Sequence, residues 1–505
     1  MRPRGSAADA PWLARALFFA AAWWIFDLAV ARSGVPDRLD DTWEYGLVAR
    51  SLLGGHGFRT PVIHPPLWGL RDAALTVPVL VHGPLVPVLL APALALFGHG
   101  ALDRIAWLGA LGAIAAVIPL VRLGERCGDG AIGFAAALLW TLAPLTLNAV
   151  HHDVSLTIGA ALALAAVERA TRGDSRVAAS VAAGIAIGLA ALARPELLLA
   201  VPLLAPLSAR RVAAYLLGAL ACLAPWWMHH ALAVGQPLFN LSSYLVIGYW
   251  PPHPGISVMR DFSLPPDRFA AALASSWRAL PAKWADFFPH ALKRALLVPT
   301  AACGWLAALG AAFALFRPAA TSGGAGDAGH SRFSHLATFR MLALALIPIA
   351  VMTVTLYDDR YLTPLLPLWA LAAARGARDL AMRAPEWARR PRAWIGALLL
   401  LIAPTVAPFA RDQVTLARAH ERALAQDRAR LAEWRAADAA GGAPCLLFSD
   451  TPDFVAWTTG CSVVWVTEAE YRALPISPDA SGLPVRSGDS ARDAWFHSGE
   501  PGLTR

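Results

Sequence analysis

The segment HGPLVPVLLAPALALFG (residues 82–98) decides how this chain is threaded through a membrane. It is apolar, but it is shorter than the about 20 residues that a spanning helix needs, and it contains Pro84, Pro87 and Pro92. A proline inside a helix removes a backbone hydrogen bond and bends the helix. The segment therefore favours a helix that lies on the outer membrane surface or dips partway into the bilayer.

The composition predicts a polytopic membrane protein. Of the 505 residues, 57% are hydrophobic and 15% are charged, and the mean hydropathy of +0.49 is too high for a soluble enzyme. Apolar runs near the length of a membrane span recur along the chain. We expect eleven spans, at residues 12–31, 101–121, 131–150, 154–168, 177–193, 196–208, 212–231, 292–316, 341–357, 361–374 and 393–410.

The placement of arginine predicts the orientation. If residues 82–98 do not span, the Arg-bearing loops lie on the side of Arg2 and Arg4, which is the positive-inside pattern. The net charge of +8 then reflects topology, and the sequence has no basic, aromatic-interleaved segment, so we exclude nucleic acid as a partner. We expect a bacterial inner-membrane protein with an uncleaved signal anchor and a cytoplasmic N-terminus. Residues 32–100, 232–290 and 411–505 would lie in the periplasm.

The expected fold is an all-α polytopic membrane protein with about 11 transmembrane helices, outer-face juxtamembrane helices and a small C-terminal α/β periplasmic domain. The transmembrane domain would cover residues 1–410 and the periplasmic domain residues 411–505. In the periplasmic domain, the sequence predicts a helix over 414–438. A strand, a short helix and a second strand are then expected in APCLLFSDTPDFVAWTTGCSVVWV (443–466). Cys445 and Cys461 could face each other on neighbouring strands and form a disulfide, or remain two unpaired thiols.

The stretch RLDDTWEYGLVARSLLGGHGF (38–58) places Asp40, Asp41 and Glu44 together beside a membrane. The apolar residues that follow recur at helical spacing and predict a short amphipathic helix over 42–53 on the outer membrane surface. Asp41 at its N-cap and Glu44 three residues later fit a capping box. A carboxylate at this place can instead remove a proton from a hydroxyl group, and spacing alone leaves both roles open.

The turn NAVHHDVSL (148–156) places His151, His152 and Asp153 at the outer end of a helix. Two His and one Asp suit a metal ion, but adjacent residues on one short turn rarely converge on one ion. A helix cap at Asp153 and a catalytic acid at Asp153 are the other interpretations.

The stretch LYDDRYLTPLLP (356–367) puts a guanidinium at an outer helix boundary. Arg360 stands there beside Tyr357, Asp358, Asp359 and Tyr361. One interpretation is an interfacial aromatic belt with a salt-bridged arginine. The other is a guanidinium that holds a phosphate bidentately and neutralises charge that grows on it.

The order of the motifs resembles a known family. DTWEY…ARSLLGGHGF, a Pro-Leu segment that ends in LFG, HHDV, GLAALARPE, APWWMHH…VGQP and YDDRYLTPLLPL follow one another as in GT-C membrane glycosyltransferases. The chain is similar to the branch that includes aminoarabinose transferases of lipid A, galacturonosyl transferases of lipopolysaccharide core and protein O-mannosyltransferases. The likeness covers most of residues 12–410, and the ordered set is more specific than any one motif.

The resemblance implies an enzyme that moves a sugar, with inversion, from a polyprenyl-phosphate donor to an envelope glycolipid, lipopolysaccharide or protein hydroxyl outside the membrane. It selects Asp41 as the catalytic acid, because the family's acid stands four positions before the helix tyrosine, here Tyr45. Asp40 is then a neighbour. The family often has Glu directly after that Asp, whereas this chain has Thr42, and Asp40 or Glu44 could take its place.

The resemblance extends to other outer residues. It implies a second catalytic acid at Asp153, and it implies that Arg360, with Tyr357 and Tyr361 beside it, contacts the departing phosphate. Arg194 in the ARPE motif is either a phosphate contact or a structural ion-pair partner. We expect no cofactor, and a divalent metal stays open.

Two rival functions differ in class. A lipid-linked sugar transporter would line its pathway with acids and arginines inside the spans, whereas here the acids collect on an outer helix. A membrane scaffold that displays its C-terminal domain would leave the carboxylates of residues 40–44 without a role. The sequence therefore favours the transferase.

Overall fold

The computed structural model describes residues 10–31, 41–127, 129–171, 176–249, 253–297, 335–355, 358–438, 446–467, 469–470 and 495–496. The chain forms two compact units. The first comprises Met1–Gly34, Ile105–Pro225 and Trp284–Thr415, and the second comprises Val35–Arg104, Trp226–Lys283 and Leu416–Arg505. The three parts of the second unit coincide closely with the three segments that the arginine pattern predicts outside. The expected domain boundary at 410/411 stays a prediction.

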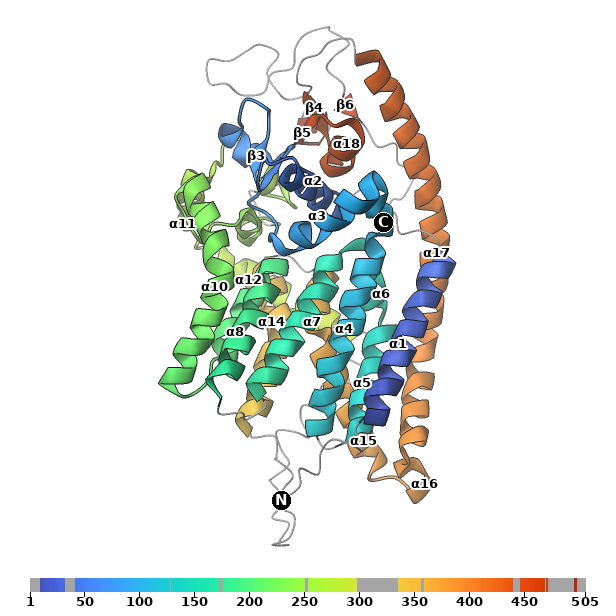
Figure 1. Cartoon of the computed structure of the whole chain (residues 1–505). Coiled ribbons are helices and arrows are strands. Elements are labelled where there is room, and N and C mark those ends of the chain that lie inside the picture. Colours follow the sequence, from blue (N-terminus) through green and yellow to red (C-terminus); the bar gives the residue numbers. More distant parts are fainter. Residues whose placement is uncertain are drawn as a thin grey trace. The chain divides into compact units, whose positions relative to one another are not determined.

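The first unit is a bundle of helices (Figure 1). Its elements are α1 (Ala10–Ala31), α4 (Ile105–Arg126), α5 (Gly130–Leu142), α6 (Pro144–His152), α7 (Val154–Thr171), α8 (Val177–Ala193), η3 (Pro195–Leu199), α9 (Ala200–Leu204), most of α10 (Ala209–Val234) and of α12 (Leu280–Leu297), α14 (His335–Val354), η7 (Asp359–Leu365), α15 (Leu366–Ala381), α16 (Glu386–Arg389) and the start of α17 (Pro391–Asp438). Its core consists mainly of Ala, Leu, Val and Ile. Most helix boundaries lie within a few residues of the predicted spans.

Small residues let these helices approach closely. A Cβ on Gly124 of α4 would lie 2.2 Å from the Cα of Gly133 on α5, and a Cβ on Gly109 would lie 2.7 Å from the carbonyl oxygen of Val150 on α6. In a membrane, helices associate through such close packing, because lipid removes the hydrophobic drive between them.

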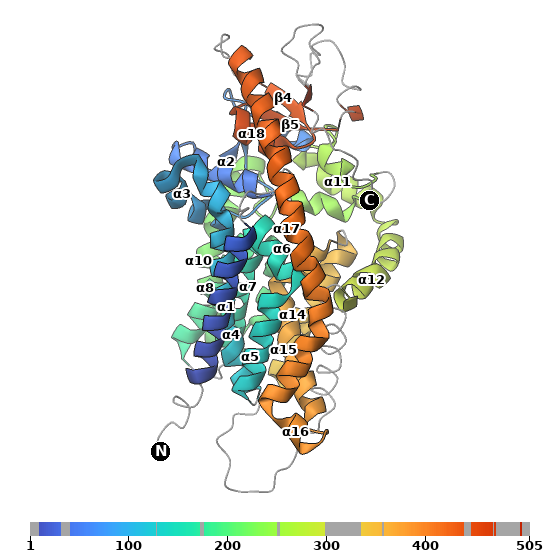
Figure 2. The same cartoon turned by 90° about the vertical axis from the view of Figure 1, so that its right-hand side faces the viewer.

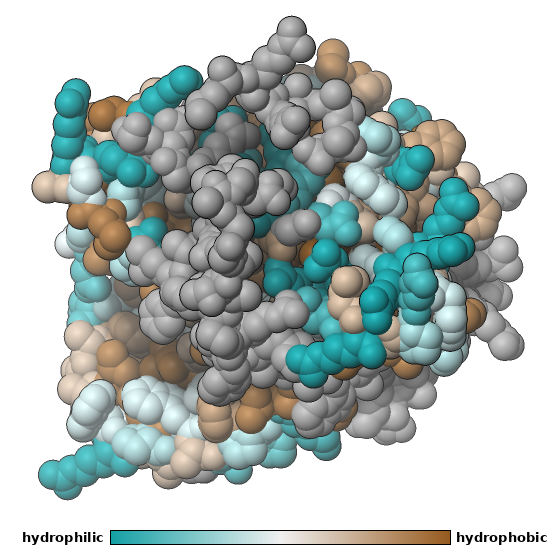
Figure 3. Space-filling model, turned by 90° about the horizontal axis from the view of Figure 1, so that it is seen from below, coloured by the Kyte–Doolittle hydropathy of each residue, from teal (hydrophilic) through white to brown (hydrophobic). Residues whose placement is uncertain are grey.

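Four helical segments among the described residues are long and apolar enough to cross a membrane: Pro11–Ala29, Gly100–Arg126, Val154–Thr171 and Ala209–Val234. The helices α5 and α6 are bent by 55° relative to each other. If they count together as one span, there are up to five candidate spans. The protein is thus a mostly helical multi-pass membrane protein, and the expected count of eleven is not confirmed. Seen from below, hydrophilic residues are interspersed with hydrophobic ones (Figure 3).

The second unit contains a small parallel sheet. Its helices and turns are α2 (Asp41–Leu53), η1 (Pro65–Leu70), α3 (Leu85–Phe97), η2 (Gly98–Arg104), η4 (Leu241–Val246), η5 (Ser257–Arg260), η6 (Pro266–Arg268), α11 (Phe269–Ser276) and α18 (Pro452–Thr459). Its strands are β1 (Arg59–Thr60), β2 (Val62–Ile63), β3 (Val77–Pro78), β4 (Leu446–Ser449), β5 (Ser462–Trp465) and β6 (Trp495–Phe496). β1 pairs antiparallel with β3, and the other strands are parallel in the order β2-β5-β4-β6.

The C-terminal strand, helix and strand confirm the prediction for residues 443–466, but they do not form the sheet alone. Val62 and Ile63, from the first loop, pair with Val463 and Val464 at one edge. Cys461, directly before β5, is disulfide-bonded. Cys445 lies outside the described residues.

Two local predictions change in the structure, and the helix expected within residues 82–98 is present. α2 is not an amphipathic surface helix, because Thr42 through Ala49 are all buried; α3, η2 and α18 pack on it. α17 runs without a break from Pro391 to Asp438 (Figure 2), where a span and a separate helix were expected. The run 82–98 does form a helix, α3, whose 13 residues extend about 20 Å, too short for a bilayer core.

Candidate active site

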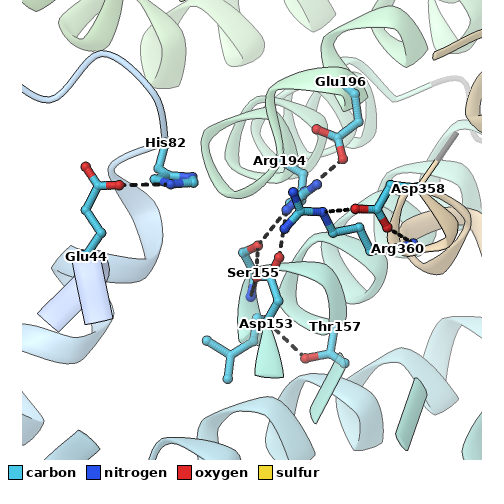
Figure 4. A network of polar contacts seen from close by, with 10 residues as sticks. Glu44, His82, Asp153, Ser155, Thr157, Arg194, Glu196, Asp358 and Arg360 are labelled. Carbon is cyan, nitrogen blue, oxygen red and sulfur yellow. Dashed lines mark hydrogen bonds and ion pairs between the residues drawn. The ribbon is translucent and has the colours of Figure 1, made fainter. Parts of the chain in front are cut away.

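The acids of α2 lie inside the second unit. The Glu44 carboxylate, buried with a side chain only 4% exposed, is 3.0 Å from His82 Nε2 (Figure 4). The His82 ring stands edge-on to the ring of Tyr45, with centroids 5.2 Å apart. Glu44 therefore pairs with the loop before α3. Asp41 begins the helix and is half-buried.

Aromatic packing fixes α18 against α2. The buried Trp43 ring lies 5.4 Å from the Phe454 ring and 6.2 Å from the Trp457 ring. Gly46 permits this approach, since a Cβ there would meet Trp457 at 3.1 Å. Arg50 stacks over the Trp457 ring at 5.0 Å. Asp453 directly precedes Phe454. This packing therefore brings the side-chain carboxyl group of Asp453 to the acids of α2.

Sequence reasoning missed two groups of this cluster, His64 and Asp453. Burial lowers the pKa of His64 to about 4, and the charges of Glu44 and Asp41 only partly oppose this. Burial, together with the charges of Glu44 and Asp41, raises the pKa of Asp453 well above its usual value. A polar residue at the start of a predicted helix was the available signal for Asp453. For His64 no local pattern distinguishes it from a surface histidine.

A second polar cluster lies in the first unit, around Arg194. Its Nη1 donates to Asp153 at 2.9 Å and its Nε donates to Glu196 at 2.8 Å (Figure 4). Asp153 also accepts hydrogen bonds from the backbone N–H and the hydroxyl of Ser155. Asp153 thus caps α7, as one interpretation predicted, and its charge is compensated by a buried guanidinium.

Arg360 occupies a more open position in the same unit. Its Nε lies 2.8 Å from Asp358, and the two side chains are 38% and 33% exposed. Asp358 also caps the turn by accepting from the Arg360 backbone N–H. The Arg194 guanidinium lies 5.8 Å from the centre of the Tyr361 ring. Arg294 forms a separate pair with Asp359 at 2.6 Å.

The structure thus brings together Asp41, Glu44 and Tyr45 in one unit and Asp153, Arg194 and Tyr361 in the other. Asp40 and Tyr357 lie outside the described residues. His151 contacts Asp27 at 2.7 Å. Among the residues that the structure describes, no three His, Cys, Asp or Glu side chains are grouped so that they could hold a metal ion.

Comparison with known proteins agrees with the motifs. Residues 81–229 match the family described as dolichyl-phosphate-mannose-protein mannosyltransferase. The apo oligosaccharyltransferase of Archaeoglobus fulgidus aligns with a TM-score of 0.58 at 14% identity, over 94% of this chain and 67% of that one. The fold is similar to that of this oligosaccharyltransferase. The resemblance expected from the sequence is confirmed.

Two further structures are similar. The complex of AglB from Archaeoglobus fulgidus with an inhibitory peptide and a dolichol-phosphate gives a TM-score of 0.55 at 15% identity, over 90% of this chain and 64% of that one. Apo ArnT from Cupriavidus metallidurans gives a TM-score of 0.50 at 14% identity, over 92% of this chain and 87% of that one. This chain spans about two thirds of the archaeal enzymes. A comparison with curated protein sequences gives no match.

Proposed function

We propose that the protein is an inverting glycosyltransferase that moves a sugar from a polyprenyl-phosphate donor to an acceptor hydroxyl at the periplasmic face of a bacterial inner membrane. The observation that carries the proposal is the set of shielded carboxylates on α2, within a GT-C fold. The acceptor would be a lipopolysaccharide, a glycolipid or a protein. AglB, which shares the fold, was solved with a dolichol-phosphate, and this supports a polyprenyl-phosphate donor here.

Asp41 is the catalytic base of this proposal. It accepts the proton of the acceptor hydroxyl while that oxygen forms a bond to the anomeric carbon. The bond from that carbon to the phosphate oxygen breaks, and the phosphate leaves with the bonding electrons. Asp153 is less suited to this role, because its buried carboxylate is already engaged by the Arg194 guanidinium. Asp153 instead positions Arg194.

Arg360 is the proposed contact for the leaving phosphate. Its guanidinium lies beside Asp358 and is partly exposed, so a phosphate can reach it. Arg194 is buried and engaged by both Asp153 and Glu196. We therefore assign Arg194 to holding η3 and α7 together and Arg360 to the phosphate, with Tyr357 and Tyr361 as its neighbours.

The proposed topology has eleven spans, a cytoplasmic N-terminus and the second unit in the periplasm. The short length of α3 supports this topology, since a helix of 13 residues is too short to cross the bilayer. The direction in which each later span crosses the membrane is then unchanged. The transmembrane domain would then cover 1–410 and the periplasmic part 411–505.

The proposal is tested with purified protein in detergent and a radiolabelled polyprenyl-phosphate sugar, supplied with envelope lipids and proteins as acceptors. We expect release of polyprenyl phosphate together with labelled product. A lipid-linked sugar transporter would leave the donor intact. Mass spectrometry of lipopolysaccharide, glycolipids and envelope proteins from a deletion strain then identifies the acceptor. Intact donor with every acceptor fraction would refute the proposal.

A further inference from the structure

Among the described residues near the acids of α2, three side chains carry buried polar atoms that have no hydrogen-bond partner. They are Glu44 Oε1, both ring nitrogens of His64 and Asp453 Oδ1. His64 is 6% exposed. Buried polar atoms in proteins are nearly always hydrogen-bonded, because an unpaired one loses its water without compensation. Groups left in this state point to a ligand that supplies the missing bonds.

The three groups occupy one neighbourhood, although they come from separate parts of the chain. The charges of Glu44, Asp41 and His82 act on both His64 and Asp453. The pairing of β2 with β5 and the packing of α18 on α2 hold these segments together. His64, which follows β2, stands edge-on to the ring of Trp465, with centroids 5.2 Å apart.

The charges around the cluster determine which ligand fits. Asp41, Glu44 and Asp453 contribute carboxyl groups, and the His82 imidazole is engaged by Glu44. Of the arginines close to it, Arg50 stacks on Trp457 and Arg428 stacks on Trp43 at 5.7 Å. A phosphate would be repelled here, since carboxylates dominate.

Sugar hydroxyls match the unpaired atoms. Each hydroxyl donates one hydrogen bond and accepts others, so it can donate to a carboxylate and accept from the N–H of a neutral imidazole. The ring of a neutral sugar carries adjacent hydroxyls and no charge. It can thus satisfy Glu44, His64 and Asp453 together.

We propose that Glu44, His64 and Asp453 form a binding site for the hydroxyl groups of an uncharged sugar ring, to which α18 contributes Asp453. The inference deepens the proposed transferase function and rests on it. The ring could belong to the donor or to a sugar of the acceptor, and both present the same hydroxyl chemistry. The C-terminal segment is then part of the sugar site and not merely an appended domain.

The test measures binding to the purified full-length protein in detergent by saturation-transfer NMR. One series of probes is the methyl glycosides of glucose, galactose, mannose and arabinose, and the other is the farnesyl-phosphoryl derivatives of the same sugars. Farnesyl phosphate and inorganic phosphate serve as sugar-free probes. Variants are Asp453→Asn, which keeps the shape of the side chain, and His64→Asn. The matched control is Asp267→Asn, an exposed carboxylate in the same unit.

We expect at least one sugar probe to bind, and both cluster variants to weaken its binding by about tenfold or more, because a buried hydrogen bond to the sugar is lost. Asp267→Asn should bind as the wild type does. If the variants lose binding of the farnesyl-phosphoryl sugars alone, the site belongs to the donor. If they lose binding of the methyl glycosides, the site belongs to the acceptor. Binding of farnesyl phosphate should not change.

Two results would overturn the inference: no sugar probe binds the wild type, or the cluster variants bind sugar as the wild type does. A variant that unfolds is recognised by its thermal transition, and the comparison then rests on the other cluster variant. The outcome is separable from the proposed function. If the wild type releases polyprenyl phosphate but Asp453→Asn binds sugar as the wild type does, only the sugar site is refuted. If sugar binding depends on Asp453 but the wild type does not cleave the donor, only the transferase function is refuted.

Discussion

At the scale of single residues, environment separates two aspartates with similar sequence context. Both Asp41 and Asp153 stand at the start of a helix in the chain. Asp153 is buried and paired with Arg194, whereas Asp41 is half-buried beside Glu44. The Asp153 carboxylate is therefore already engaged in holding Arg194. The base of the proposed reaction is therefore Asp41.

Replacing Asp41 with Asn should remove nearly all sugar transfer. Loss of a general base costs about 10²- to 10⁴-fold in rate. The amide keeps the size of the side chain and can still accept a hydrogen bond at the helix start, so folding should persist. The measurement is the transfer rate per folded protein, with Asp267→Asn as the control. A rate within a few fold of the wild type would leave Asp41 with a capping role alone.

Arg360→Lys should impair transfer even though the positive charge is kept. An ammonium cannot make the two parallel hydrogen bonds that a guanidinium makes to a phosphate. Arg294→Lys is a matched control, since Arg294 is also partly exposed and also pairs with a carboxylate of this region, Asp359. The assay compares kcat and donor KM of the two variants. An unchanged rate and KM in Arg360→Lys would contradict the phosphate contact.

At the scale of elements, glycines determine how closely the helices of the first unit pack. α4 and α5 meet at Gly124 and Gly133, where the backbones leave no room for a Cβ. Backbone atoms cannot move aside as the end of a side chain can. The α4–α5 contact therefore depends on these two glycines.

Gly124→Ala should destabilise the protein by about 1 to 3 kcal/mol, because the added methyl group forces the two helices apart. Gly396→Ala on α17 is the control, since no heavy atom lies within 4 Å of a Cβ there. That change should be neutral or stabilising by up to about 1 kcal/mol, because alanine favours a helix. Thermal unfolding in detergent compares the two Tm values. Equal shifts would show that α4 and α5 tolerate separation.

At the scale of the whole molecule, topology depends on whether α3 spans the membrane. Its 13 residues and its packing on α2 indicate that it does not. In the proposed topology of eleven spans, the Arg-rich turns then lie on the side of the N-terminus.

Cysteine labelling in cells tests this topology. With the native free thiols replaced by Ser, a thiol reagent that cannot cross the inner membrane should label a cysteine at the exposed Ala73. It should label one at the exposed Glu386 of α16 only after the membrane is permeabilised. Ala73 precedes α3 and serves as the accessible control. Equal labelling at both positions in intact cells would mean that residues 82–98 span after all.

The sequence by itself predicts the elements of this protein and the family they resemble. Apolar runs mark most helices within a few residues, and the turn residues around 443–466 mark the strand, helix and strand. These are local signals, because hydrophobic spacing and backbone preferences act between residues near each other in the chain. The carboxylates of α2 were found in the same way.

Only the tertiary structure decided which polar groups meet. Glu44 pairs with His82, Asp153 pairs with Arg194, and β2 completes a sheet whose other strands lie about 400 residues later. Local pattern also predicted an exposed face for α2, which is buried by α3 and α18. Partners of this kind are separated by long stretches of chain, and their pairing depends on how whole elements pack. No spacing within one segment could therefore bring His64 and Asp453 to the acids of α2.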